Sequence, residues 1–277
     1  MSIAPIYMRP TDRITAGAWT LTGTARAGYP VTALDDGDPS APVWITGNSI
    51  VLVRNMTAPT LVDGVTIHAH TLVNASVLKV QMHTADSWAT PDVDITVTIP
   101  TAYRDGFSLD LFVNVKALYP VAANRTKQYL RVINTVANPV TVAIGEIAIW
   151  GAQRTFSRTF SVNGLVPQDI EHLATKSTSK RGVSTVYDMG TKERRWTGVV
   201  MATQADLEDL LAWREDARGI VKPSVFVFQP GYSGARYAEP VFCRFASARV
   251  NPSFQWSELI PVTIELEELG RGELLGA

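Results

Sequence analysis

Three histidines are the side chains in this sequence whose type and spacing come closest to those of a metal-binding or catalytic site. His68 and His70 lie two residues apart in an alternating run, so in a β-strand both imidazoles project from the same face. With His83 as a third nitrogen ligand, such a set could bind a metal ion. The alternative is a pair of buried histidines with satisfied hydrogen bonds, which is the commoner situation. We therefore expect His68 and His70 to be structural.

No motif of a catalytic site accompanies the histidines. The sequence has no Gly-x-Ser-x-Gly elbow, no glycine-rich phosphate loop and no His-Glu-x-x-His helix. Adjacent carboxylates such as Glu267 and Glu268 point in different directions from a strand or helix, so they cannot act as a facing acid–base pair. Cys243, the one cysteine, lies in an apolar alternation that predicts a buried side chain. The sequence therefore predicts a protein that is not an enzyme.

Charge and hydropathy narrow the range of partners. The 277 residues include 25 Lys and Arg against 26 Asp and Glu, a net charge of −1. Without an excess of positive charge we expect no sequence-specific nucleic-acid binding, and without a long apolar run we expect no membrane insertion. The N-terminus has no secretory signal pattern, which predicts synthesis in the cytoplasm. Only 18% of the residues are charged, and a surface poor in charge favours assembly with other chains.

The pattern of short runs predicts the elements that carry these residues. From Trp19 to Trp150, runs of period two are separated by Asn, Asp, Gly and Pro, which is typical of an antiparallel β-sandwich of about eight strands. The fold class is therefore mainly β, with two units predicted over residues 1–153 and 154–277.

The second unit is predicted to combine strands with one helix. Thr203, with Asp206 three residues on to complete a capping box, is the expected N-cap of a helix over about residues 204–218. The polar stretch 163–182 predicts a long loop, and residues 188–192 predict a hairpin turn.

Aromatic residues beside turns of the first unit are candidate ligand contacts. Tyr29, Trp44 and Trp88 each flank a turn, and a sugar ring can stack on such an aromatic face while Arg54 donates hydrogen bonds. The alternative is that Trp44 closes the end of the sandwich as a core residue. Tyr29 and Trp88 are expected to be the exposed ones.

One turn of the first unit is acidic enough to bind calcium. Asp35, Asp36 and Asp38 place three carboxylates around Gly37, and calcium takes six to eight oxygen ligands. A solvated acidic turn is the alternative. The sequence thus predicts either no cofactor or a structural calcium ion.

The first unit, over about residues 15–152, resembles the galactose-binding, discoidin-like jelly roll. The resemblance rests on Trp19, on Ala27-Gly28-Tyr29-Pro30, on the run from Leu34 to Ser40 followed by Trp44, and on Val65 to Leu72. It implies a structural calcium in the acidic Asp-Gly turn, a packed histidine at position 70, and binding of sugars or other partners by loops at one end.

The second unit is similar to minor and distal tail (tail-tip) proteins of long-tailed bacteriophages. The strand-helix-strand order and the closing segment from Trp256 to Glu268 carry this resemblance. It implies a tail-tube-like β-sandwich in a homo-oligomeric ring around a sixfold or threefold axis. The partners implied are other tail proteins such as tube, tape measure and hub, and the place implied is the tail of the virion.

Lys176, Lys180 and Arg181 form a positive cluster in the predicted loop. Solvated loop charges are one interpretation. The other is a functional loop that becomes ordered in the assembly, where it docks on an acidic neighbouring subunit or lines a ring lumen through which DNA passes.

Two functions follow from these expectations. The first is a structural component of a phage tail tip or baseplate, in which the second unit joins a ring. The jelly roll then projects outward to contact proteins or the cell surface, including a host surface glycan. The second is a free-standing carbohydrate-binding module or adhesin. A closed ring favours the first function, and a monomer that binds glycan favours the second.

Overall fold

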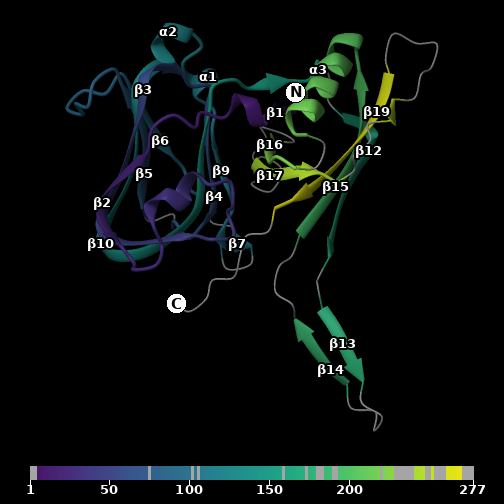
Figure 1. The fold of residues 1–277 in the computed structure, drawn as a ribbon, viewed down its shortest axis with the longest axis horizontal. Coiled ribbons are helices and arrows are strands. Elements are labelled where there is room, and N and C mark those ends of the chain that lie inside the picture. Colours follow the sequence, from purple (N-terminus) through teal and green to yellow (C-terminus); the bar gives the residue numbers. More distant parts are fainter. Residues whose placement is uncertain are drawn as a thin grey trace.

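The computed structural model describes residues 5–73, 76–100, 103–104, 107–157, 160–171, 174–178, 184–188, 193–218, 221–227, 240–246, 251–252 and 260–269. They form two β-rich domains and a two-stranded hairpin that extends away from both (Figure 1). The predicted fold class, mainly β, is confirmed. No helix in the described part of the chain is both long and apolar enough to cross a lipid bilayer.

The first domain is a curled sheet with nine strands among the described residues. The strands are β2 (Trp19–Ala25), β3 (Val43–Leu61), β4 (Gly64–His70), β5 (Val77–His83), β6 (Val93–Val97), β7 (Tyr103–Arg104), β8 (Phe107–Ser108), β9 (Leu111–Val113) and β10 (Thr126–Trp150). Short helical turns connect some of them: η2 (Val31–Asp35), α1 (Val115–Leu118) and α2 (Ala122–Arg125).

Strand β10 holds the two layers of this domain together. Its residues 129–135 pair with β5, its residues 144–150 pair with β4, and β3 follows it along almost its whole length. The register shifts between Thr135 and Val140, where such an irregularity lets a strand bend from one layer to the other. Alternate side chains therefore point into one core, which includes Val65, Ile67, Leu78, Val80, Leu130, Val132, Ile147 and Ile149.

The second domain is an antiparallel sheet covered by one helix. The sheet contains β1 (Ile6–Met8), β11 (Arg154–Thr155), β12 (Phe160–Glu171), β15 (Glu193–Ala202), β16 (Ser224–Val227), β17 (Pro240–Phe245), β18 (Asn251–Pro252) and β19 (Ile260–Glu268).

The helix of the second domain is α3 (Gln204–Asp216), which agrees with the prediction. Thr203 and Asp206 form the expected capping box at its start. Trp213 of α3 stacks on Tyr7 and Phe226 of the sheet, with ring centroids 4.6 and 6.0 Å apart. This aromatic cluster attaches the helix to the sheet.

The first domain is inserted into the second. The N-terminal strand β1 pairs with β16 and β11, so the chain leaves the second sheet after η1 (Pro10–Asp12) and returns to it through β11. The two crossings lie side by side, because Ile14 N donates to Ile149 O at 2.8 Å and Gly151 N donates to Asp12 O at 2.7 Å. The predicted division at residues 153 and 154 takes no account of this N-terminal strand.

Apolar packing holds the two domains together. Buried side chains of both form one cluster, which includes Met8, Trp150, Val225 and Phe242. A junction with a shared buried apolar cluster favours a fixed orientation of the first domain relative to the second.

The predicted long loop of the second unit is wrong. Residues 163–182 contain most of β12 and the strand β13 (Ala174–Thr178), which pairs with β14 (Ser184–Asp188). Of the predicted hairpin turn at 188–192, Asp188 ends β14, and residues 189–192 lie outside the described residues. In the described residues, β13 and β14 pair with each other and with no third strand.

Candidate binding surface

His68 and His70 are buried and hydrogen-bonded, as expected of structural histidines. His68 is buried and its Nδ1 lies 2.9 Å from Asp110 Oδ2, while His70 is buried with Nε2 3.0 Å from Leu109 O. His83 is half-buried, and its Nδ1 accepts a hydrogen bond from Ala85 N. In the described part of the chain, no three His, Cys, Asp or Glu side chains gather as metal ligands would. Cys243 is buried too.

The four predicted ligand contacts do not share one surface. Trp44 is buried, and Arg54 is completely buried, where it donates from Nε to Ala16 O at 3.0 Å and lies over the ring of Trp19. Neither side chain can reach a ligand in solution. Tyr29 is half-buried beside Arg26, and Arg26 N donates to Trp44 O, which places this loop beside the first residues of β3.

Trp88 lies on the outer face of the first domain, in the β5–β6 connection. The guanidinium of Arg131 lies over its ring, 4.3 Å from the centroid, and its Nε1 donates to Asp86 Oδ1 at 2.8 Å. Arg131 is fixed in turn by Gln81, whose Oε1 accepts from Arg131 Nε at 3.0 Å. The indole is therefore held in one orientation while remaining partly exposed.

A second aromatic ring, Tyr129, lies on the same outer face. It pairs with His83 of β5 on one side and with Asn55 of β3 on the other, so three neighbouring strands present these side chains in a row. Because Leu130 is in the core, Tyr129 and Arg131 point outward. Asn55 Nδ2 lies 3.5 Å from the Tyr129 hydroxyl.

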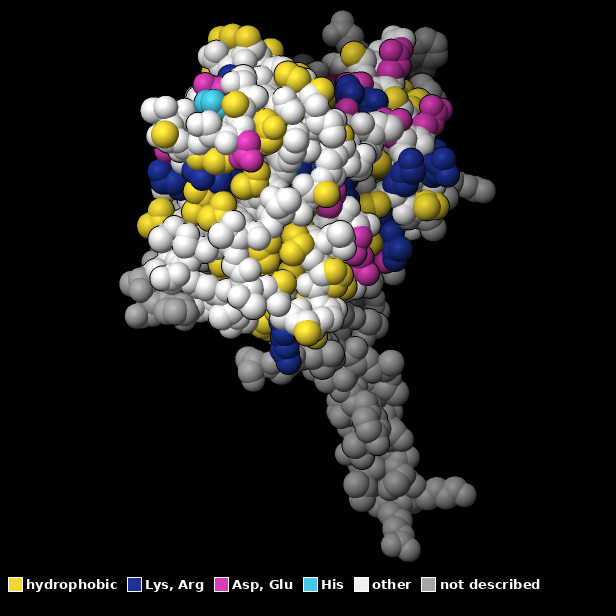
Figure 2. All heavy atoms as spheres, turned by 60° about the vertical axis from the view of Figure 1, so that its left-hand side comes forward, with side chains coloured by type: hydrophobic (Ala, Val, Ile, Leu, Met, Phe, Trp, Pro, Cys, Tyr) yellow, Lys and Arg dark blue, Asp and Glu magenta, His cyan; other side chains and the backbone are white. Residues whose placement is uncertain are grey.

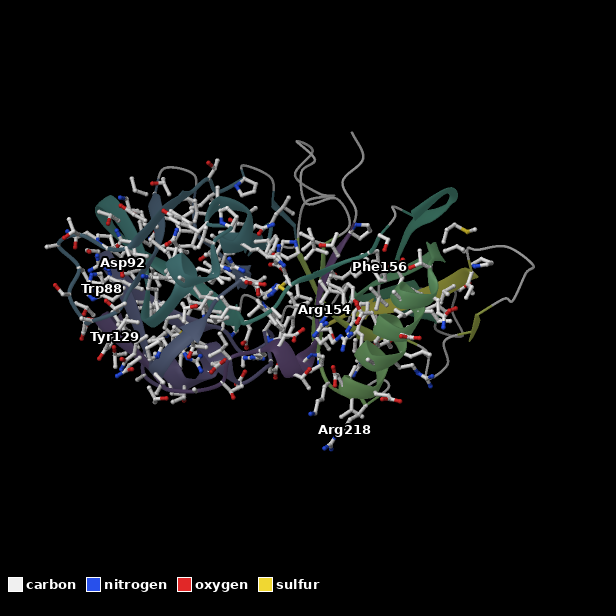
Figure 3. The ribbon with its side chains drawn as sticks, turned by 90° about the horizontal axis from the view of Figure 1, so that it is seen from above. Trp88, Asp92, Tyr129, Arg154, Phe156 and Arg218 are labelled. Carbon is white, nitrogen blue, oxygen red and sulfur yellow. The ribbon has the colours of Figure 1, made fainter. Side chains whose placement is uncertain are left out.

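We name Trp88, Arg131, His83, Tyr129 and Asn55 the Trp88 platform. Figure 3 places Trp88, Tyr129 and Asp92 together at the end of the first domain that is farthest from α3. Of these five residues, only Trp88 was predicted from the sequence as a ligand contact. The other four residues share outward-facing positions on β3, β5 and β10. These positions can be recognised as neighbours only when the register of the three strands is known.

The charges around the platform are paired. Lys127 Nζ lies 2.9 Å from Asp92 Oδ2, and its hydrogen bond lowers the pKa of that carboxyl. Lys79 Nζ lies 3.0 Å from Asp94 Oδ2, and Gln81 Nε2 donates to the other oxygen of Asp94. Figure 2, which turns this side of the domain forward, shows apolar, basic and acidic side chains intermixed. Among the described residues, the charges around the Trp88 platform therefore form no large patch of one sign.

The acidic turn does not fit a calcium ion. Asp35 Oδ1 lies 2.7 Å from Arg13 Nη2, and Asp35 Oδ2 lies 2.5 Å from Arg54 Nη1. Asp36 Oδ1 accepts from Asp38 N at 2.8 Å, and Asp38 Oδ1 accepts from Ser40 N at 2.9 Å. Each carboxylate thus has protein donors of its own, whereas calcium requires several oxygens that converge on one point.

A buried glutamate lies behind this turn. Glu146 of β10 is completely buried, forms a short ion pair with Arg13, and accepts from Gly37 N at 3.0 Å. Burial raises the pKa of Glu146 to about 8, although Arg13 and the Gly37 N–H act in the opposite direction. The acidic turn and β10 are therefore joined through Arg13.

Of the predicted assembly residues, Lys176 belongs to strand β13. Lys180 and Arg181 lie outside the described residues.

Comparisons with solved structures find carbohydrate-binding domains that have low sequence identity and low TM-scores relative to this chain. No protein-family model matches the chain, and no curated protein matches it. A chitosan-binding module of a chitosanase/glucanase from Paenibacillus sp. IK-5 is 20% identical, with a TM-score of 0.36, over 50% of this chain and 97% of that one. The lectin domain of lectinolysin complexed with Lewis B antigen is 11% identical, with a TM-score of 0.36, over 49% and 93%.

A third similar structure is the CBM32 domain of AlyQ in complex with 4,5-unsaturated mannuronic acid. It is 15% identical, with a TM-score of 0.32, and covers 48% of this chain and 95% of that one. Each of the three corresponds to about half of this chain. None of these comparisons supports the expected relation to phage tail proteins, which stays a prediction.

Proposed function

We propose that this chain is a non-catalytic binding protein whose first domain holds a neutral carbohydrate on the Trp88 platform. The observation that carries the proposal is the pair of partly exposed rings, Trp88 and Tyr129, among hydrogen-bonding side chains on one outer face. A sugar presents an apolar C–H face that packs on an aromatic ring, and hydroxyls at its edge that need polar partners. Asn55 and Gln128 supply such partners beside Tyr129.

The ion pairs of the platform favour an uncharged sugar. Lys127 is paired with Asp92, and Lys79 with Asp94. Arg131 is engaged by Gln81 and lies in the field of Asp94 and Asp86. An acidic sugar would have to compete with these carboxylates for each cation, whereas a neutral one needs only hydrogen bonds and ring contact.

Binding of the full-length chain to neutral polysaccharides in affinity gel electrophoresis tests the proposal. Trp88→Ala and Tyr129→Ala should each weaken binding by roughly tenfold or more, as loss of an aromatic anchor does. Tyr29→Ala is the matched control, because Tyr29 is also half-buried but lies beside the other end of β3. Loss of binding in Tyr29→Ala, with Trp88→Ala unaffected, would move the site to the loop that contains Tyr29.

A second proposed function is assembly into a ring at a phage tail tip, with tube, tape-measure and hub proteins as partners. The observation in its favour is the β13–β14 hairpin, which extends from the second sheet and pairs with no further strand in the described residues (Figure 1). An isolated two-stranded hairpin is marginally stable in water, so a neighbouring subunit is a natural support for it. In this proposal the chain resides in the virion tail and the Trp88 platform faces outward.

The oligomeric state of the full chain tests this second function. Mass photometry should show a closed ring for the wild-type chain. A variant in which a two-residue turn joins Glu171 directly to Glu193 lacks the hairpin. These two residues pair across β12 and β15, so a short turn can connect the two strands. This variant should be monomeric. A wild-type chain that is monomeric at high concentration would contradict the ring and leave the carbohydrate proposal intact.

A further inference from the structure

Two arginines and two carboxylates form a closed group between the acidic turn and β10. Arg13 bridges Asp35 and Glu146, and Arg54 holds the second oxygen of Asp35 at 2.5 Å. The side chains of Arg54 and Glu146 are 0% exposed, and those of Arg13 and Asp35 are 10% and 15% exposed. Charges this far from water persist only when they are paired.

The two carboxylates come from segments far apart in the sequence. Asp35 ends η2 and Glu146 lies within β10, and the guanidinium of Arg13 contacts both. Bridging separate carboxylates is what a divalent cation does in a structural site. We infer that the guanidinium of Arg13 takes the place of a structural cation, so that the acidic turn is fixed to β10 without calcium.

The balance of charge supports this inference. With both carboxyls ionised, Asp35 and Glu146 carry two negative charges, and Arg13 and Arg54 supply the two positive charges that one divalent ion would supply. A calcium ion added to this group would leave two uncompensated positive charges in a buried place, which is unfavourable. Calcium could enter only if an arginine left.

The backbone around the group is fitted to this direct attachment. Gly37 has a φ of +85° and donates from N to Glu146 Oε2, so the turn itself contacts the carboxylate. At Gly145, a Cβ atom would lie 2.4 Å from Pro39 O, which shows how closely the turn approaches β10. Arg54 is held in place by Ala16 O. These contacts hold Arg13 and its partners in one geometry.

Thermal unfolding of the full-length chain in calcium or in a chelator tests the inference, and the measurement belongs above pH 8, where Glu146 is ionised. The wild-type Tm should be the same in both solutions. Arg13→Ala should lower the Tm by roughly 10 °C, because it leaves two buried carboxylates with one arginine between them. Calcium, but not magnesium or added potassium chloride, should restore part of that loss, because it fits the vacated position.

Two further variants keep the test decisive. Arg26→Ala removes an exposed arginine of the same domain and should behave as the wild type does. Arg13→Lys keeps the charge but loses the planar fork, so it should fold with a lowered Tm that does not respond to calcium, even where Arg13→Ala fails to fold. A rise of the wild-type Tm in calcium, a wild-type Tm for Arg13→Ala, or an Arg13→Ala protein that calcium does not stabilise would each overturn the inference.

Discussion

Glu146→Gln should change how the stability of this protein depends on pH. The pKa of Glu146 is about 8 in the folded chain, whereas the ordinary value for a glutamate, which applies to the unfolded chain, is 4.5. Between these values the folded state binds more protons than the unfolded state, so the free energy of unfolding falls as pH rises. The slope for one such group approaches about 1.4 kcal/mol per pH unit, which amounts to roughly 3 kcal/mol over two units.

The assay is urea denaturation of the wild-type chain and of Glu146→Gln at several pH values from about 5 to about 8. Glutamine has nearly the same shape and does not titrate, so the difference between the two free energies of unfolding isolates Glu146 from all other groups. The free energy of unfolding of the wild type should fall by roughly 3 kcal/mol relative to that of Glu146→Gln as pH rises through two units. Glu208→Gln, at an exposed position on α3, provides the control.

A difference that stays constant with pH would show that Glu146 has no raised pKa in the folded chain. A difference that shifts in favour of the wild type as pH rises would show that Arg13 outweighs burial and lowers the pKa. Either result would refute the reasoning.

Three further variants test other parts of the structure. Gly37→Ala should destabilise the chain by roughly 1–3 kcal/mol in urea denaturation, because φ is +85° and the new Cβ would lie 3.4 Å from Arg13 Nη1. Asp206→Ala should cost roughly 1–2 kcal/mol, because it removes the half of the capping box that accepts from Thr203 N and also the hydrogen bonds from Ser157. Burial favours a raised pKa for Asp206, but the hydrogen bonds from Ser157 and Thr203 lower it overall, so this cost should shrink in acid as the carboxyl is protonated. Trp213→Phe should lower the Tm by several degrees, since the indole N–H donates to buried Ser224 Oγ at 2.8 Å.

Local patterns in the sequence predicted the elements that depend on local chemistry. The period-two runs between Trp19 and Trp150 predicted strands, and β5 and β6 lie in this range with one face of each in the core. Thr203 and Asp206 predicted the start of α3 because the capping box is complete within four residues. Both signals are short-range, so they require no knowledge of the tertiary structure.

Features that depend on distant residues could not be predicted in this way. Three residues, Ile6 to Met8, are too few to show a period, and their pairing with β16 depends on residues more than two hundred positions away. Arg54 was expected at a ligand, but Asp35, Ala16 and Trp19 enclose it, and nothing in the sequence links these positions. The hairpin β13–β14 was interpreted as a loop, because its polar sequence shows no apolar alternation of the kind that predicts a strand.

Trp88 shows how far the sequence leads toward the candidate site. Its place beside a turn indicated an exposed ring, and the structure shows it half-buried on the outer face. Tyr129 and His83 were not identified with it, because the register between β5 and β10 brings them together.

The most direct test of the central proposal is a glycan microarray probed with the full-length chain and with Trp88→Ala, at low and at high salt. The Trp88 platform predicts that the wild-type chain binds neutral glycans equally in both solutions and that Trp88→Ala loses these signals. Binding of acidic glycans alone, lost at high salt, would contradict the neutral specificity. No binding of any glycan by the wild-type chain would contradict carbohydrate binding itself.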